Sequence, residues 1–112
     1  EVVFLPDKTM LVTERTGSLV IIKNGETDRI QIQDVYSSGE GGLLGMALHP
    51  DFQTNHLLYL YLSYRDAGQT KNRVERYIFE SNQLSDKKVI IENLPGSGNH
   101  NGGRIAFGPD KL

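Results

Sequence analysis

Apolar residues along this chain occur in short runs separated by turn-forming residues, which predicts strands. The runs are rich in β-branched and aromatic residues and are bounded by Gly, Asn, Asp or Ser. No window of a dozen residues keeps the 3.6-residue apolar period of a helix. We therefore expect an all-β protein with strands at 2–5, 10–13, 19–22, 30–32, 46–48, 57–63, 74–79, 89–91 and 105–107.

A Pro-Asp pair follows three of these apolar runs and reveals a repeat. The prolines are Pro6, Pro50 and Pro109. Proline presets the backbone of a tight turn, and aspartate can bond to nearby backbone groups. Repeats on the order of 50 residues are typical of propeller blades of four strands each. A small antiparallel sandwich fits the same strand spacing, but it leaves the repeat unexplained.

The spacing predicts a β-propeller fragment of about two four-stranded antiparallel blades. One blade covers about residues 2–32, a second about 43–92, and the first strand of a third about 103–109. Propeller blades bury their faces mainly against neighbouring blades, so two of them make an incomplete fold. The first residue is Glu1 rather than methionine, and no signal peptide is visible, which suggests a piece of a longer chain.

Two glycine-rich stretches precede the strands that end in Pro50 and Pro109. If these are the innermost strands of their blades, both loops open on one face near the central axis, opposite the Pro-Asp turns. Glu40 lies in the first loop and His100 in the second, between Asn99 and Asn101. An imidazole at the mouth of such a site can accept a proton near neutral pH. A loop histidine that only caps a turn is the alternative.

Other charged residues and histidines have simpler interpretations. The turns at 14–17 and 64–68 should open on the same face as the glycine loops, where we expect Glu14, Arg15 and Arg65 to be solvated charges. We expect His49 to be structural, on the opposite face, and His56 to be an exposed loop residue.

Composition excludes several functions. The 112 residues carry a formal net charge of −2 and no basic run, so nucleic acid is not an expected partner. The apolar runs are far shorter than the roughly 20 residues that span a bilayer. The absence of cysteine excludes disulfides and thiolate metal sites. No zinc, EF-hand, nucleophile-elbow or phosphate-loop motif is present.

Three motifs together resemble the glucose/sorbosone dehydrogenase family, the soluble aldose dehydrogenases that use pyrroloquinoline quinone. They are Leu5-Pro6-Asp7 with the run from Met10 to Gly17, the stretch Gly39 to Phe52, and His100 to Arg104. The resemblance covers nearly the whole chain in order and spacing. It implies a six-bladed propeller of which this chain is about the first third.

The resemblance also implies roles for single residues. His100 matches the family's general base, which takes the proton of the anomeric hydroxyl while hydride passes to the quinone. Glu40 matches a substrate-pocket position that is glutamine in the best-known glucose enzyme, and Asn99 stands where that enzyme has aspartate. Both differences weigh against a strict preference for glucose, and Asn101 is a further pocket residue.

The resemblance places the quinone and calcium ligands beyond Leu112, so the fragment alone should be inactive. It further implies a sugar substrate, a separate electron acceptor and a periplasmic or extracellular location. Two other functions stay open: a non-catalytic extracellular binding propeller of the same family, and a calcium-dependent lactone hydrolase, which would need axial carboxylates of which only Glu40 is visible.

Overall fold

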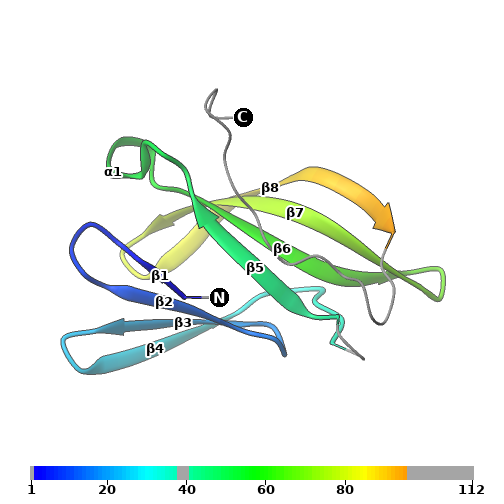
Figure 1. Cartoon of the computed structure of the whole chain (residues 1–112), viewed down its shortest axis with the longest axis horizontal. Helices are drawn as coiled ribbons and strands as arrows, with labels where there is room; N and C mark the ends of the chain where they lie inside the picture. The colour runs from blue at the N-terminus through cyan, green and yellow to red at the C-terminus, as the bar shows by residue number, and fades with distance from the viewer. Residues whose placement is uncertain (1, 38–40, 96–112) are drawn as a thin grey trace.

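Two four-stranded antiparallel sheets make up the computed structural model, which describes residues 2–37 and 41–95 (Figure 1). The N-terminal sheet contains β1 (Val2–Phe4), β2 (Met10–Glu14), β3 (Ser18–Lys23) and β4 (Glu26–Gln31). The C-terminal sheet contains β5 (Leu43–Leu48), β6 (Leu57–Asp66), β7 (Gln69–Glu80) and β8 (Gln83–Pro95), and α1 (Phe52–Asn55) connects β5 to β6. In both sheets the strand order follows the chain, as in a propeller blade. The predicted fold class is confirmed.

Three of the hairpins use the turn chemistry that matches strand twist. The two-residue loops are Asn24-Gly25, Ala67-Gly68 and Ser81-Asn82, and both central residues of each loop have positive φ. Such turns twist in the same sense as the flanking strands. They fix the register of β3–β4, β6–β7 and β7–β8.

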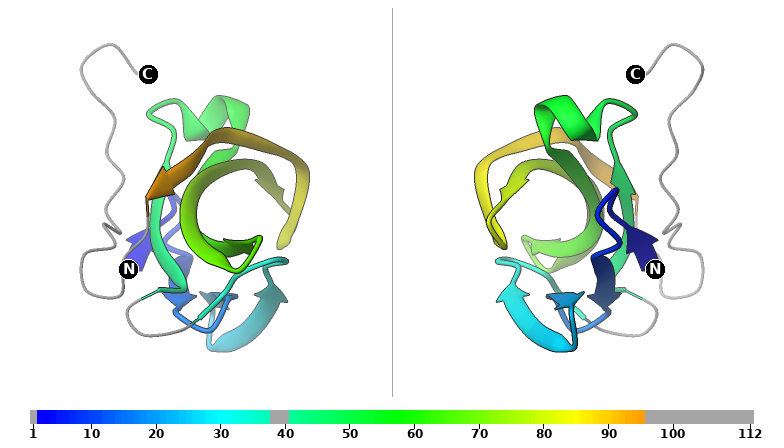
Figure 2. Two further views of the ribbon diagram at one scale, coloured as in Figure 1. Left: turned by 90° about the vertical axis from the view of Figure 1, so that its right-hand side faces the viewer. Right: turned by 90° about the vertical axis from the view of Figure 1, so that its left-hand side faces the viewer.

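The hydrophobic core lies between the two sheets. Leu11, Leu19 and Ile21 of the N-terminal sheet are almost completely buried, as are Leu58 and Leu60 of β6. The inner strands β1 and β2 pack against β5, while the long strands β6 to β8 curl away from them (Figure 2). The inner strands therefore bring the ends of the two sheets together.

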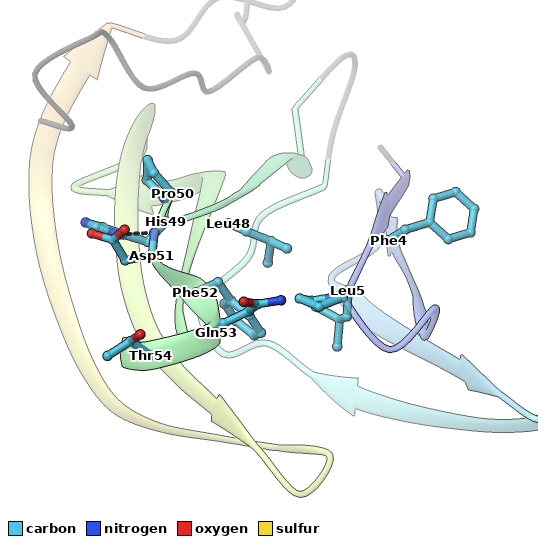
Figure 3. A pocket seen from close by; sticks show the side chains of 10 residues that line it. Phe4, Leu5, Leu48, His49, Pro50, Asp51, Phe52, Gln53 and Thr54 are labelled. Atoms are coloured by element: carbon cyan, nitrogen blue, oxygen red, sulfur yellow. Dashed lines mark hydrogen bonds between the residues drawn. The ribbon is translucent and has the colours of Figure 1, made fainter.

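The Pro6 and Pro50 turns lie on one face, as predicted. Both line a pocket of about 510 Å³, together with Leu5, Leu48 and Phe52 (Figure 3). The third turn, at Pro109, lies outside the described residues. The predicted placement of these turns is confirmed for the two that can be compared.

The outer strands are longer than predicted. β4 starts at Glu26 rather than Ile30, and β8 starts at Gln83 rather than Val89. The added residues are mostly polar and exposed. Backbone hydrogen bonds to β3 or β7 hold them in the strand, and burial of apolar side chains does not. The short α1 was not predicted, because a single turn carries no apolar period.

The sheets span residues 2–31 and 43–95. The strand predicted at about 103–109 lies outside the described residues. How the whole protein divides into blades, at 2–32 and 43–92, stays a prediction.

Candidate functional site

The predicted site residues Glu40, Asn99, His100 and Asn101 all lie outside the described residues. Their roles stay predictions. The structure does describe the elements next to Gly41 and Gly42: the turn after β2, residues 32–37 after β4, and the hairpin that joins β6 to β7. We call this end of the two sheets the loop end; it lies to the right in Figure 1.

Gly41 and Gly42, which follow Glu40, are fixed against the β2–β3 turn. Arg15 donates from Nε to the Gly41 carbonyl at 3.2 Å, and the Leu43 amide donates to the Arg15 carbonyl at 2.9 Å. Gly42 has a φ of +143°, and a Cβ there would lie 2.2 Å from the Arg15 carbonyl oxygen. Only glycine permits so close an approach of two backbones.

The β6–β7 hairpin approaches the same point. The Ser63 amide donates to the Gly42 carbonyl at 2.8 Å, and the Tyr36 amide donates to the Ser63 carbonyl at 2.8 Å. The turns at 14–17 and 64–68 therefore open at one end of the molecule together with the exit of the first glycine loop, as the sequence predicted.

Of the three charged residues expected to be solvated at this end, Arg15 and Arg65 are exposed and Glu14 is half-buried, and each has a partner. Glu14 accepts two hydrogen bonds from Arg29, at 3.1 and 3.0 Å. These bonds and the guanidinium charge lower the pKa of Glu14 and raise that of Arg29. Arg65 donates to the Tyr36 hydroxyl at 2.6 Å and to the Gly68 carbonyl at 2.9 Å. The predicted exposure is confirmed for Arg15 and Arg65, and Arg15 in addition bonds to the Gly41 carbonyl.

A buried carboxylate, which sequence reasoning missed, lies in the C-terminal sheet. Glu75 is 0% exposed and pairs with Arg73 at 2.7 Å and with Lys87 at 3.3 Å. It also accepts a hydrogen bond of 2.7 Å from the Tyr77 hydroxyl. Burial, followed by the bond to Glu75, raises the pKa of Tyr77 above its usual value near 10. Glu75 alternates with the buried Tyr77 and Phe79, and that period was the available signal.

His49 has the structural role that we predicted, at the Pro50 turn. Its Nδ1 accepts a hydrogen bond from the Asp51 amide at 3.0 Å, lies 3.0 Å from Asn55 Nδ2, and its ring stacks on Tyr59. His56 differs from the prediction, because its side chain is only 38% exposed. It stacks on Phe52 and lies 3.3 Å from the Glu80 carboxylate.

Within residues 2–37 and 41–95, no group of three or more His, Asp or Glu side chains could hold a metal ion. In the same part of the chain, no helix is long and apolar enough to cross a membrane.

Comparison with known proteins identifies the family of this chain. The family model for glucose/sorbosone dehydrogenases matches residues 1–112. The chain therefore belongs to the glucose/sorbosone dehydrogenase family.

Individual relatives of this chain are also named as sugar dehydrogenases. The chain is 33% identical to the aldose sugar dehydrogenase YliI of Escherichia coli, over 93% of this chain and 30% of that protein. It is 29% identical to quinoprotein glucose dehydrogenase B of Acinetobacter calcoaceticus, over 95% of this chain and 25% of that protein.

Solved structures share the fold. A putative oxidoreductase (glucose dehydrogenase) of Thermus thermophilus superposes with a TM-score of 0.88 at 38% identity, over 98% of this chain and 33% of that one. The PQQ-bound aldose sugar dehydrogenase of Streptomyces coelicolor gives 0.86 at 34% identity, over 98% and 34%. The chain thus spans about a quarter to a third of the length of the relatives it matches.

Proposed function

We propose that the full-length protein oxidises aldoses at the anomeric carbon with pyrroloquinoline quinone, and that His100 is the general base. The family match over residues 1–112 carries this proposal. The quinone in the Streptomyces relative supports the choice of cofactor. Two sheets within about a third of the relatives' length correspond to a six-bladed propeller in the whole protein.

His100 acts in its neutral form, because a protonated ring cannot accept the proton of the anomeric hydroxyl. Glu40, Asn99 and Asn101 orient the other sugar hydroxyls through hydrogen bonds. A bound quinone would supply the acceptor for the hydride of the anomeric carbon. The anchoring of Gly41 and Gly42 by Arg15 and Ser63 supports a pocket role for Glu40, since it gives the loop a fixed exit.

Arg73, one of the cations at the loop end, is paired with the buried Glu75 and is therefore not available to a carboxylate of the quinone. The described part of the chain has no cluster of metal ligands. The family match supports the further proposal that residues beyond Leu112 hold both cofactors, and that the protein lies in the periplasm or outside the cell and passes electrons to a separate acceptor.

Dye reduction by the full-length protein, reconstituted with quinone and calcium, tests the proposal over a panel of aldoses. His100→Gln should lower kcat by about 10²–10⁴-fold, the usual contribution of a positioned base, with quinone binding retained spectroscopically. His56→Gln, at the opposite end of the sheets, is the matched control and should leave kcat unchanged.

Glu40→Gln should change which aldoses are accepted and raise KM more than it lowers kcat. Near wild-type turnover in His100→Gln with quinone bound would overturn the role of the base. The non-catalytic binding propeller would then be the better interpretation.

A further inference from the structure

The loop end has a pocket of its own, distinct from the one at the Pro6 and Pro50 turns, and described residues line it. It has a volume of about 510 Å³ and lies between the segment that follows β4 and the β6–β7 hairpin. Asp34, Tyr36, Tyr64, Arg65, Asp66 and Arg73 line it. That volume is within the range of small-molecule sites in proteins. None of the residues assigned to sugar oxidation contributes to it.

The two arginines that line this pocket are held in place by contacts with neighbouring side chains. Arg73, whose side chain is 13% exposed, is held by the buried Glu75 and lies over the Tyr64 ring, 4.5 Å from its centroid. Arg65 lies over the Tyr36 ring at 4.6 Å and bonds to its hydroxyl. Burying an ion pair such as Arg73–Glu75 generally adds little net stability compared with apolar residues. Its presence here favours a role in holding the pocket's shape.

The charges of the pocket select for a neutral ligand. Two arginines face two aspartates, so the lining has no net charge. At Arg73 an anion would have to compete with Asp34 and Glu75, and at Asp34 a cation would have to compete with Arg73 and Lys87. An uncharged ligand that both donates and accepts hydrogen bonds meets neither obstacle.

Donors and acceptors remain for such a ligand. Asp34 makes ion pairs of 3.7 and 3.8 Å, longer than hydrogen bonds, so its carboxylate oxygens can still accept from hydroxyl groups. Within the described part of the chain, Arg65 uses Nη1 and Nη2 for one bond each, and a guanidinium has five N–H donors. Val35 and the part of the Tyr36 ring that Arg65 does not cover supply apolar surface.

From these features we propose that the pocket binds a saccharide, with Asp34 and Arg65 bonding its hydroxyls. Carboxylate and guanidinium groups suit neighbouring hydroxyls, and aromatic surface suits the C–H face of a sugar ring. The inference rests on the proposed function only for the choice of saccharides as probes. It gives the protein a second place at the loop end where a sugar is held.

Hydrogen exchange with mass spectrometry locates binding along the chain and tests the site. The full-length protein, without added quinone, is titrated with glucose, with maltotriose and, separately, with sodium phosphate. We expect the saccharides to slow exchange in peptides covering 32–37 and 64–68, and phosphate to leave them unchanged. Protection by phosphate alone, or no protection by either saccharide at about 100-fold excess over the protein and above, would overturn the proposal.

Matched variants separate the site from an indirect effect. Asp34→Asn and Arg65→Ala should each raise the saccharide concentration that gives half-maximal protection about tenfold, because each removes a charged hydrogen-bond partner. Asp34 has a φ of +67°, which asparagine also adopts readily, so the backbone should be kept. Asp86→Asn is the control: Asp86 has a φ of +53° and is exposed outside the pocket. Unchanged protection in both pocket variants would also overturn the site.

The outcome is independent of the oxidation assay. If dye reduction is absent but these two segments are protected, the proposed function fails and the saccharide site stands. If aldoses are oxidised while the segments stay unprotected at every saccharide concentration, the site is wrong and the proposed function stands.

Discussion

The two sheets have the same strand order but use charge differently. In the N-terminal sheet, ion pairs such as Arg29–Glu14 and Lys23–Asp7 lie on the surface, with side chains 38–60% exposed. In the C-terminal sheet, Glu75 is completely buried among Arg73, Lys87 and Tyr77. Surface pairs add little to stability, whereas a buried charge is costly once its partner is removed. The same topology thus supports a plain packing sheet and a sheet with a polar interior.

The largest loss of stability is expected when the buried cluster of Glu75, Arg73 and Lys87 loses its carboxylate. Glu75→Ala should destabilise the full-length protein by about 3–5 kcal/mol, because it leaves Arg73 and Lys87 without their buried partner. Glu14→Ala is the control in the other sheet and should scarcely change the urea midpoint, since its pair with Arg29 is exposed. Equal shifts of the two urea midpoints would contradict the distinction between the sheets.

The junction between the sheets is the next most sensitive point. Gly42→Ala should cost about 2–3 kcal/mol, because it forces a side chain into a positive φ and against the Arg15 carbonyl. Gly25→Ala is the matched control: its φ is +81°, but nothing lies within 4 Å of a new Cβ. Its cost should be the backbone strain alone, about 1 kcal/mol. Urea unfolding of both variants measures the difference, and a Gly25 variant as unstable as the Gly42 variant would rule out the steric contact as the cause.

Alkaline pH should weaken the C-terminal sheet through Tyr77. Its pKa is raised in the folded state, so the unfolded chain loses this proton first. The stabilising contribution is therefore complete below about pH 10 and is lost as the pH rises above that value. Tyr77→Phe should show a smaller loss of stability between about pH 10 and 11 than the wild-type protein. Identical slopes in the two proteins would show that Tyr77 titrates normally.

Acid pH should have the smallest effect, through Asp7 of the N-terminal sheet. Hydrogen bonds from Thr9 and then from Lys23 lower its pKa to about 2. A lowered pKa stabilises the folded state above about pH 4, and the contribution is lost as the pH falls toward 2. Asp7→Asn should remove this slope, and thermal unfolding over the same pH range compares the two proteins. Because Asp7 is exposed, a large slope would contradict its surface character.

Sequence reasoning predicted the strands that bury apolar side chains. It missed the polar parts of the outer strands and the buried carboxylate in β7. Short apolar runs bounded by turn residues located β2 and β3, where Leu11, Leu19 and Ile21 enter the core. The polar starts of β4 and β8 gave no such signal, because backbone pairing holds them. Glu75 was not singled out in the sequence, because only its alternation with Tyr77 and Phe79 indicates burial.

The candidate site was predicted unevenly, for a similar reason. Glycine and proline positions revealed where the backbone turns, so the common face of the Pro6 and Pro50 turns was predictable. The contact between Gly41 and Arg15 was not, because a side chain that crosses from one sheet to the other leaves no local pattern. The same holds for the pairing of Asp34 with Arg73, which are far apart in the sequence.

The hairpin connections within each sheet have a consequence for how this chain folds. Every paired strand is joined to its neighbour by a short link, so each sheet can close through local steps. The docking of β5 on β1 and β2, by contrast, joins segments that are distant in the sequence. During synthesis, the N-terminal sheet can therefore form before β5 has emerged from the ribosome. Leu11 and Ile21 then stay exposed to water until the second sheet covers them. The docking of β5 is therefore the step that completes the core between the two sheets.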